Sequence, residues 1–125
     1  MSKLPARDQA LSALYAADVR GTPPDTAGLS ARAGRYVAGT WQQLNELDAA
    51  ISAAATGWRV ERMPAVDRNI LRLALYELWL GDTPVGVVVS EAVKLAKRFS
   101  TERSGAFVNG VLSKLISVDP ADSAV

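Results

Sequence analysis

The segment AVDRNILRLALYELWL, residues 65–80, constrains the fold most strongly. Drawn as an α-helix, it places apolar side chains around most of its circumference and leaves Arg68 and Arg72 on a narrow polar strip. A helix that is apolar nearly all round lies in the middle of a bundle, because each of its sides must be covered by a neighbour. The segment therefore predicts a central helix with other helices packed around it.

Helical periodicity continues through most of the remaining chain, and strand signals are nearly absent. Turn sequences rich in glycine and proline separate the periodic segments. We expect Pro64 in the first turn of the central helix, Gly57 at the end of the preceding helix and Ser104 as the N-cap of the last helix. The prediction is an all-α bundle with helices at 5–19, 30–43, 46–56, 64–80, 84–99 and 104–117, followed by a frayed tail at 118–125.

The composition fits one globular domain over residues 1–125. Apolar residues make up 49% of the chain and charged residues 22%, as in ordinary soluble proteins. The formal charge of +1 means that any nucleic-acid site must be a local patch. Because no signal-peptide pattern and no membrane-length apolar run is found, we expect a cytoplasmic protein without a membrane partner.

The chain contains no cysteine and no histidine. Disulfides, thiolate nucleophiles and zinc–thiolate sites are therefore excluded, as are the commonest general base and the commonest metal ligand. The glycines form no phosphate-binding loop. We predict that the protein is not an enzyme and holds neither a metal nor a cofactor.

Glu77 is unusual because it falls on the same side of the central helix as Ile70 and Leu73. A buried carboxylate needs a partner or a raised pKa. The favoured interpretation is an ion pair or helix-end hydrogen bond that joins two helices. The alternative is a catalytic acid beside a polar cleft.

The first helix carries two apolar stripes about 100° apart. Alanines and Leu14 form one stripe, and Leu11, Tyr15 and Val19 form the other. One stripe can face the core. The second stripe either covers another part of the same bundle, which geometry alone favours, or contacts a partner protein.

The segment STERSGAFVNGVLSKL, residues 100–115, combines aromatic and basic side chains. Phe107 lies at the edge of the apolar face of the predicted helix, with Lys114 beside it and Arg103 just before the helix start. The region from residue 94 to residue 114 holds five basic residues and a single acid, and includes Phe99. Such a patch is typical of single-stranded RNA binding, with stacked bases and cation–phosphate contacts. The alternative is that Phe107 turns into the core and the cations are solvated.

Three motifs, MPAVDRNILRLALYEL, VSEAVKLAKRFS and FVNGVL, follow one another in the order and spacing of the transcription antitermination factor NusB. ARDQALSALYAADVRG resembles the first helix of that family. The resemblance covers residues 6–115 and is weakest at 21–57. It implies about six to seven helices arranged in two small subdomains.

The resemblance also implies a function. NusB proteins bind boxA RNA together with ribosomal protein S10 (NusE) and help to assemble, with NusA and NusG, an RNA polymerase complex that reads through terminators, notably on ribosomal RNA operons. They perform no chemistry. Because NusB relatives exist as monomers and as dimers, a homodimer is left open.

Individual positions follow from the resemblance and from the charge pattern together. The expected RNA-binding residues are Lys3, Arg7, Lys97, Phe99, Arg103, Phe107 and Lys114. The expected NusE-binding residues are Tyr15, Asp67, Arg68 and Arg72. Asn109 of the FVNG motif is expected to form an interhelical hydrogen bond.

Two departures from the family pattern bear on RNA binding. Lys3 and Arg7 stand where relatives carry an arginine-rich run, and Arg103 occupies a position that is acidic in well-known relatives. Each lost phosphate contact weakens binding and its salt dependence. The alternative function is therefore a helical protein-interaction module, a divergent paralogue without RNA affinity.

Overall fold

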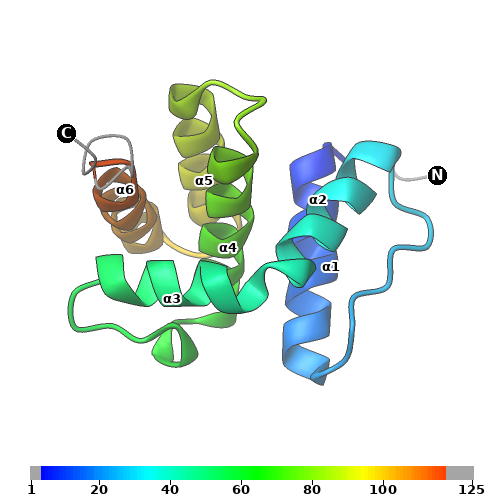
Figure 1. Cartoon of the computed structure of the whole chain (residues 1–125), viewed down its shortest axis with the longest axis horizontal. Coiled ribbons are helices and arrows are strands. Elements are labelled where there is room, and N and C mark those ends of the chain that lie inside the picture. Colours follow the sequence, from blue (N-terminus) through cyan, green and yellow to red (C-terminus); the bar gives the residue numbers. More distant parts are fainter. Residues whose placement is uncertain (1–3, 118–125) are drawn as a thin grey trace.

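The computed structural model describes residues 4–117, which fold into six α-helices (Figure 1). A single turn of 3₁₀-helix, Val60–Arg62, precedes the fourth of them. No β-strand occurs within residues 4–117, which confirms the all-α prediction. Lys3 and the predicted tail at 118–125 lie outside the described residues. The helices are α1 (Ala6–Arg20), α2 (Ala31–Gln42), α3 (Leu44–Ala54), α4 (Ala65–Leu80), α5 (Val85–Phe99) and α6 (Glu102–Ser117).

Prolines and glycines mark several helix ends, so the sequence predicts the helices to within two residues. Pro5, Pro64 and Pro84 directly precede α1, α4 and α5, with φ angles of −57°, −53° and −55°. The proline ring holds φ in this range, and its missing N–H would have no partner at a helix start. Gly81 ends α4 with a φ of 75°, a left-handed conformation that glycine adopts without a steric penalty.

Two predicted helix ends are wrong. The last helix begins at Glu102 rather than Ser104, because Oγ1 of Thr101 accepts the Ser104 backbone N–H at 3.0 Å and caps the helix. The third helix ends at Ala54, so Gly57, with a φ of 82°, shapes the following turn and does not end the helix itself.

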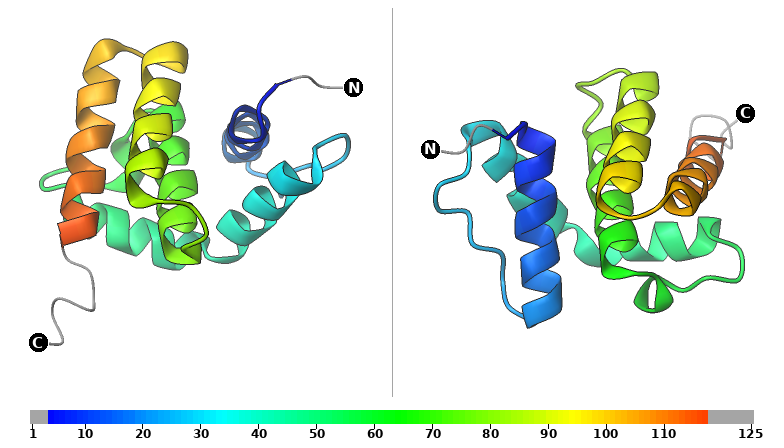
Figure 2. Two further views of the ribbon diagram at one scale, coloured as in Figure 1. Left: turned by 90° about the horizontal axis from the view of Figure 1, so that it is seen from above. Right: turned by 180° about the vertical axis from the view of Figure 1, so that it is seen from behind.

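Helix α4 lies in the middle of the molecule and contacts each of the other five α-helices. Figures 1 and 2 show α1 and α2 on one side of it and α5 and α6 on the other, while α3 crosses one end of the α4–α6 group. This arrangement confirms the predicted central helix and the division into two helical groups. The buried residues at the centre of α4 are Ile70, Leu71, Leu73, Ala74 and Leu75.

A buried ion pair joins α1 to α4. Nε of Arg7 donates to both carboxylate oxygens of Glu77, at 3.1 and 3.0 Å, and its NH2 group donates to Oε1 at 2.7 Å. The Glu77 side chain is only 2% exposed and that of Arg7 is 15% exposed. The hydrogen bond to Glu77 raises the pKa of the Arg7 guanidinium above its usual value. The pairing confirms the interpretation of Glu77 as a charged link between two helices.

Candidate nucleic-acid and partner surfaces

The Phe107 ring borders a small hollow near the start of α6. It meets the ring of Trp58 edge to face, with 6.1 Å between the centroids and 68° between the planes. Phe107 is half-buried against the core, whereas Trp58, from the loop after α3, is 51% exposed. Exposed Arg103, in the first turn of α6, lines the same hollow and forms no ion pair with any residue in 4–117. We name this feature, with Met63, Pro64, Asp67 and Ser104 completing its wall, the aromatic hollow.

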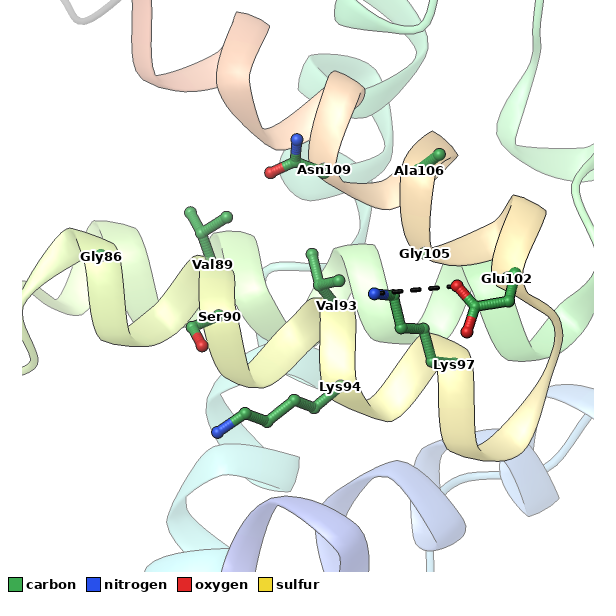
Figure 3. A pocket seen from close by; sticks show the side chains of 10 residues that line it. All are labelled: Gly86, Val89, Ser90, Val93, Lys94, Lys97, Glu102, Gly105, Ala106 and Asn109. Carbon is green, nitrogen blue, oxygen red and sulfur yellow. Dashed lines mark ion pairs between the residues drawn. The ribbon is translucent and has the colours of Figure 1, made fainter.

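A groove between α5 and α6 holds a second group of cations (Figure 3). Lys97 crosses it and pairs with Glu102 at 3.7 Å, an exposed contact that solvent and salt weaken. The stem of Lys97 passes close to Gly105, where a Cβ atom would come within 2.8 Å of the lysine Cγ. Lys94 lines the groove as well, and forms a longer contact of 3.9 Å with Glu91. The groove therefore carries exposed cations above a floor of small and apolar side chains.

Asn109 opens onto this groove and is exposed. Within residues 4–117 its side chain forms no hydrogen bond, so the predicted interhelical bond is wrong. Val89 and Val93 of α5 line the same groove and carry no polar side-chain atoms, and the polar groove residues Ser90, Lys94 and Lys97 form no hydrogen bond with Asn109 (Figure 3).

Phe99 ends α5 on a different surface from Phe107. Its ring is 47% exposed, and the Arg98 guanidinium carbon lies 5.1 Å from its centroid. Arg98 also pairs with the buried carboxylate of Asp8 at 2.9 Å, which ties α5 to α1. Phe99 lines a shallow groove together with Leu11 and Tyr15 of α1. The structure thus places this predicted RNA residue beside the predicted partner surface.

The second apolar stripe of α1 is largely uncovered. Tyr15 is 41% exposed and Val19 61% exposed, and only Leu11 is buried. The interpretation that this stripe packs within the bundle is therefore wrong for Tyr15 and Val19. The physical reason is that α1 uses its other stripe, which includes buried Leu14, to pack into the core.

The remaining predicted RNA residues are dispersed. Nε and NH2 of Arg7 donate to Glu77, as described above. Nζ of Lys114 donates to Thr56 Oγ1 at 2.7 Å, and a span of eleven residues places Lys114 roughly 16 Å along α6 from Arg103. The predicted RNA set is therefore not one cluster, and Arg103 and Phe107 are its members that share the aromatic hollow.

Asp18 of α1 is the centre of a charged network with α4. It accepts from Arg68 at 2.6 and 2.9 Å, from Asn69 at 2.7 Å and from Arg72 at 3.2 Å. Arg72 also forms a two-point pair with Asp48 of α3, at 2.7 and 2.8 Å. Burial alone would raise the pKa of Asp18, but the hydrogen bonds and positive charges together lower it below its usual value. Arg68 and Arg72 therefore connect three helices, and their contact with NusE stays a prediction.

Asp67 is buried, with 4% of its surface exposed. Its Oδ2 accepts from Ser104 Oγ at 3.0 Å, and it borders the aromatic hollow. The carboxylate is thus directed toward α6 and away from solvent. Its expected contact with NusE also stays a prediction.

Sequence reasoning missed Trp58 and Asp18. Trp58 could have been noticed because it is a large aromatic residue in a loop, directly after Gly57, where it cannot belong to the buried face of a helix. Asp18 gave no signal, because an acid near a helix end is ordinary and its three cationic or amide partners come from 50 or more residues away.

The fold and these surfaces define a class: a small all-α binding protein with an uncovered apolar helix stripe and a basic, aromatic hollow. No helix within residues 4–117 is long and apolar enough to cross a membrane. Residues 4–117 match the model of the NusB family. The chain belongs to the NusB family, which confirms the resemblance found in its motifs.

Named relatives and solved structures agree with this family assignment. The chain is 46% identical to transcription antitermination protein NusB of Symbiobacterium thermophilum, over 93% of this chain and 90% of that protein. It is 44% identical to the protein of the same name from Anaeromyxobacter dehalogenans, over 90% of this chain and 88% of that protein. The fold is similar to T. maritima NusB, with a TM-score of 0.76, 34% identity and coverage of 91% and 92% of the two chains. It is also similar to a chain in the crystal structure of antitermination factors NusB and NusE in complex with double-stranded RNA, with a TM-score of 0.79, 31% identity and coverage of 90% and 94%.

Proposed function

We propose that this protein is an RNA-binding transcription antitermination factor. It binds boxA RNA together with ribosomal protein S10 (NusE) and helps to assemble a processive RNA polymerase complex with NusA and NusG, notably on ribosomal RNA operons. It performs no reaction. The observation that carries the proposal is family membership over residues 4–117, together with a similar fold that was solved with NusE and RNA.

The geometry supports two separate contact surfaces. Arg103 and Phe107 at the aromatic hollow, with Lys97 in the neighbouring groove, supply cations for phosphates and a ring for bases. Tyr15 and Val19 supply an exposed apolar stripe that suits a protein partner. Joint binding of NusE and RNA, each strengthening the other, is the proposed mechanism.

The test is fluorescence anisotropy of a labelled boxA-type RNA, with and without NusE, at two salt concentrations. We expect binding that exceeds that of a scrambled RNA, strengthens with NusE and weakens with salt. If protein plus NusE retains boxA RNA no better than the scrambled RNA, RNA recognition is refuted.

A second candidate function is a protein-interaction module without RNA affinity. It is favoured by the internal use of three predicted RNA cations, since Arg7, Lys97 and Lys114 all bind residues of this chain. The discriminating result is NusE binding that persists in Arg7→Ala and in combined Lys97→Ala and Arg103→Ala, with no RNA binding in any of these proteins or in the wild type.

A further inference from the structure

The groove between α5 and α6, which we name the α5–α6 groove, has room for a nucleotide. Its volume is about 770 Å³, and sites for small organic ligands span about 300–1,000 Å³. The two helices are closest at the loop that joins them and diverge from there (Figure 3). Val89, Val93 and Ala106 give the groove an apolar lining. The flat face of a base can lie against such a lining.

Asn109 borders this apolar lining with a polar side chain that has no partner. It is exposed, and its side chain forms no hydrogen bond within residues 4–117. A carboxamide places N–H donors beside an acceptor oxygen in one plane. A base edge presents donors and acceptors in the same way, and asparagine pairs with adenine through N6 and N7. The amide of Asn109 therefore suits a base that lies in the groove.

Two lysines supply positive charge at the groove. Lys97 crosses it over Gly105, where a Cβ atom would lie 2.8 Å from the lysine Cγ, so the missing side chain leaves room for the lysine stem. The pair between Lys97 and Glu102, at 3.7 Å, joins side chains that are 49% and 84% exposed, so water and salt weaken it and a phosphate can displace the carboxylate. Lys94 is 66% exposed, lines the groove and points its ammonium group away from α6 (Figure 3). Both ammonium groups can therefore reach phosphates.

The groove is continuous with the aromatic hollow across the outer surface of α6. Counted at about 100° per residue, Asn109 falls on the groove side of α6 and Arg103 on the hollow side. The positions between them are those of Ala106 and Gly110, which are both exposed. No long side chain therefore separates the two surfaces at this level of the helix. A single strand that contacts Arg103 and Phe107 can cross α6 here and enter the groove.

A helix or strand from a protein partner fits the groove less well. Its apolar side chains would match the lining, but it would bury the amide of Asn109 and the ammonium group of Lys97, and each of these would then need a polar partner. A strand of RNA brings base edges and phosphates together. The region from residue 94 to residue 114 also holds five basic residues and a single acid, an excess that suits a polyanion.

We propose that the α5–α6 groove binds a nucleotide of the RNA strand that flanks the segment held at the aromatic hollow. Asn109 contacts the base, and Lys94 and Lys97 contact phosphates. The inference rests on the proposed RNA-binding function. It adds Lys94 and Asn109 to the residues expected to contact RNA, on a surface separate from the α1 stripe proposed for NusE.

The test measures the affinity of a labelled boxA-type RNA for the complex with NusE, by fluorescence anisotropy at several salt concentrations. Lys94→Ala and Lys97→Ala should each weaken binding and lower the slope of log affinity against log salt by about 0.7, the value for one phosphate contact of a single strand. Asn109→Ala should weaken binding about tenfold, in the range for one good base contact. It should leave the slope unchanged, because a base contact releases no counterions.

Two control variants match these changes. Arg35→Ala also removes one positive charge, from an exposed position of α2, which lies on the other side of α4 from α5 and α6 (Figure 1). Ser113→Ala removes an exposed polar group from α6, one turn after Asn109 and outside the groove lining. Both controls should bind RNA as the wild type does, with the same salt slope. Circular dichroism should show that every variant is folded, since all the substituted side chains are exposed.

Shorter RNAs test whether one strand occupies both surfaces. Nucleotides are removed one at a time from each end of the RNA. When the strand no longer reaches the groove, the loss caused by Lys94→Ala or Asn109→Ala should disappear, while the loss caused by Arg103→Ala should remain. If all three losses persist unchanged down to the shortest RNA that still binds, the proposal is overturned.

The outcomes separate this inference from the function on which it rests. If the wild type with NusE binds boxA RNA no better than a scrambled RNA, both are overturned. If it prefers boxA RNA, but Lys94→Ala and Asn109→Ala bind that RNA as the two controls do, only the groove assignment is overturned. Weaker NusE binding by these two variants in calorimetry without RNA, with no change in the salt slope of RNA binding, would assign the groove to a protein and would also overturn it.

Discussion

Replacing Arg7 by methionine should lower the free energy of unfolding by about 3–5 kcal/mol, because the substitution leaves a buried carboxylate without its partner. Arg7 supplies the three hydrogen bonds that the Glu77 carboxylate receives from residues 4–117. The Glu77 side chain is only 2% exposed, so water cannot replace them without a rearrangement of the core. Methionine preserves the unbranched stem of the side chain, which limits the loss of packing.

A second substitution should recover most of this loss. Arg7→Met combined with Glu77→Leu removes both charges, and a buried ion pair exchanged for apolar groups of similar volume is often neutral or stabilising. We expect the double variant to lie within about 1 kcal/mol of the wild type. Urea unfolding of the four proteins, followed by circular dichroism, then gives a coupling energy of at least about 2 kcal/mol for the pair.

Two results would refute this reasoning: a loss below about 1 kcal/mol in Arg7→Met, or a double variant no more stable than the single one. The double variant also tests the RNA role expected for Arg7. If it binds boxA RNA and NusE as the wild type does, Arg7 acts through the fold. If it is folded and binds RNA about tenfold more weakly, one lost phosphate contact is the simplest cause.

Three further predictions concern other sites. The pKa of Asp18 is lowered in the folded chain, so its contribution to stability is complete above the ordinary pKa of 3.8 and is lost as the pH falls through the folded-state pKa. Asp18→Asn should therefore flatten the acid decline in the free energy of unfolding, measured as a function of pH, and an unchanged pH profile would contradict this. Gly39→Ala should destabilise the protein by about 1–3 kcal/mol in thermal unfolding, because the new Cβ overlaps the Tyr76 ring. In the control Gly34→Ala, in the same helix, the new Cβ meets open space, and the substitution should be neutral or stabilising by about 1 kcal/mol. Equal effects of the two substitutions would show that the Tyr76 ring moves aside. Val19→Asp should weaken NusE binding about tenfold in calorimetry without changing thermal unfolding, since the side chain is 61% exposed, and unchanged affinity would remove the α1 stripe from the interface.

The candidate surfaces show where sequence reasoning stops. The aromatic and basic content around Phe107 is visible in the sequence, but the expected set of seven RNA residues assumed that nearby or aligned positions share one surface. The structure separates Phe99 from Phe107 and pairs Arg7 with Glu77. These arrangements depend on which helix covers which side of α4, and periodicity along one helix does not contain that information.

The sequence by itself determined the helices, their ends to within two residues, and the central position of α4. Prolines before helices, a left-handed glycine after one and apolar periodicity act over a few residues, so their effect is readable locally. It also determined that Glu77 must have a partner, because an unpaired buried charge is too costly.

Only the tertiary structure decided which residues pair with one another. Arg7 meets Glu77 across 70 residues of chain, and Asp67 meets Ser104 across 37. The contact of Trp58 with Phe107 likewise joins a loop to a distant helix. Many basic side chains carry the charge needed to pair with a given carboxylate. The way the helices pack across one another decides which of them is close enough to reach it.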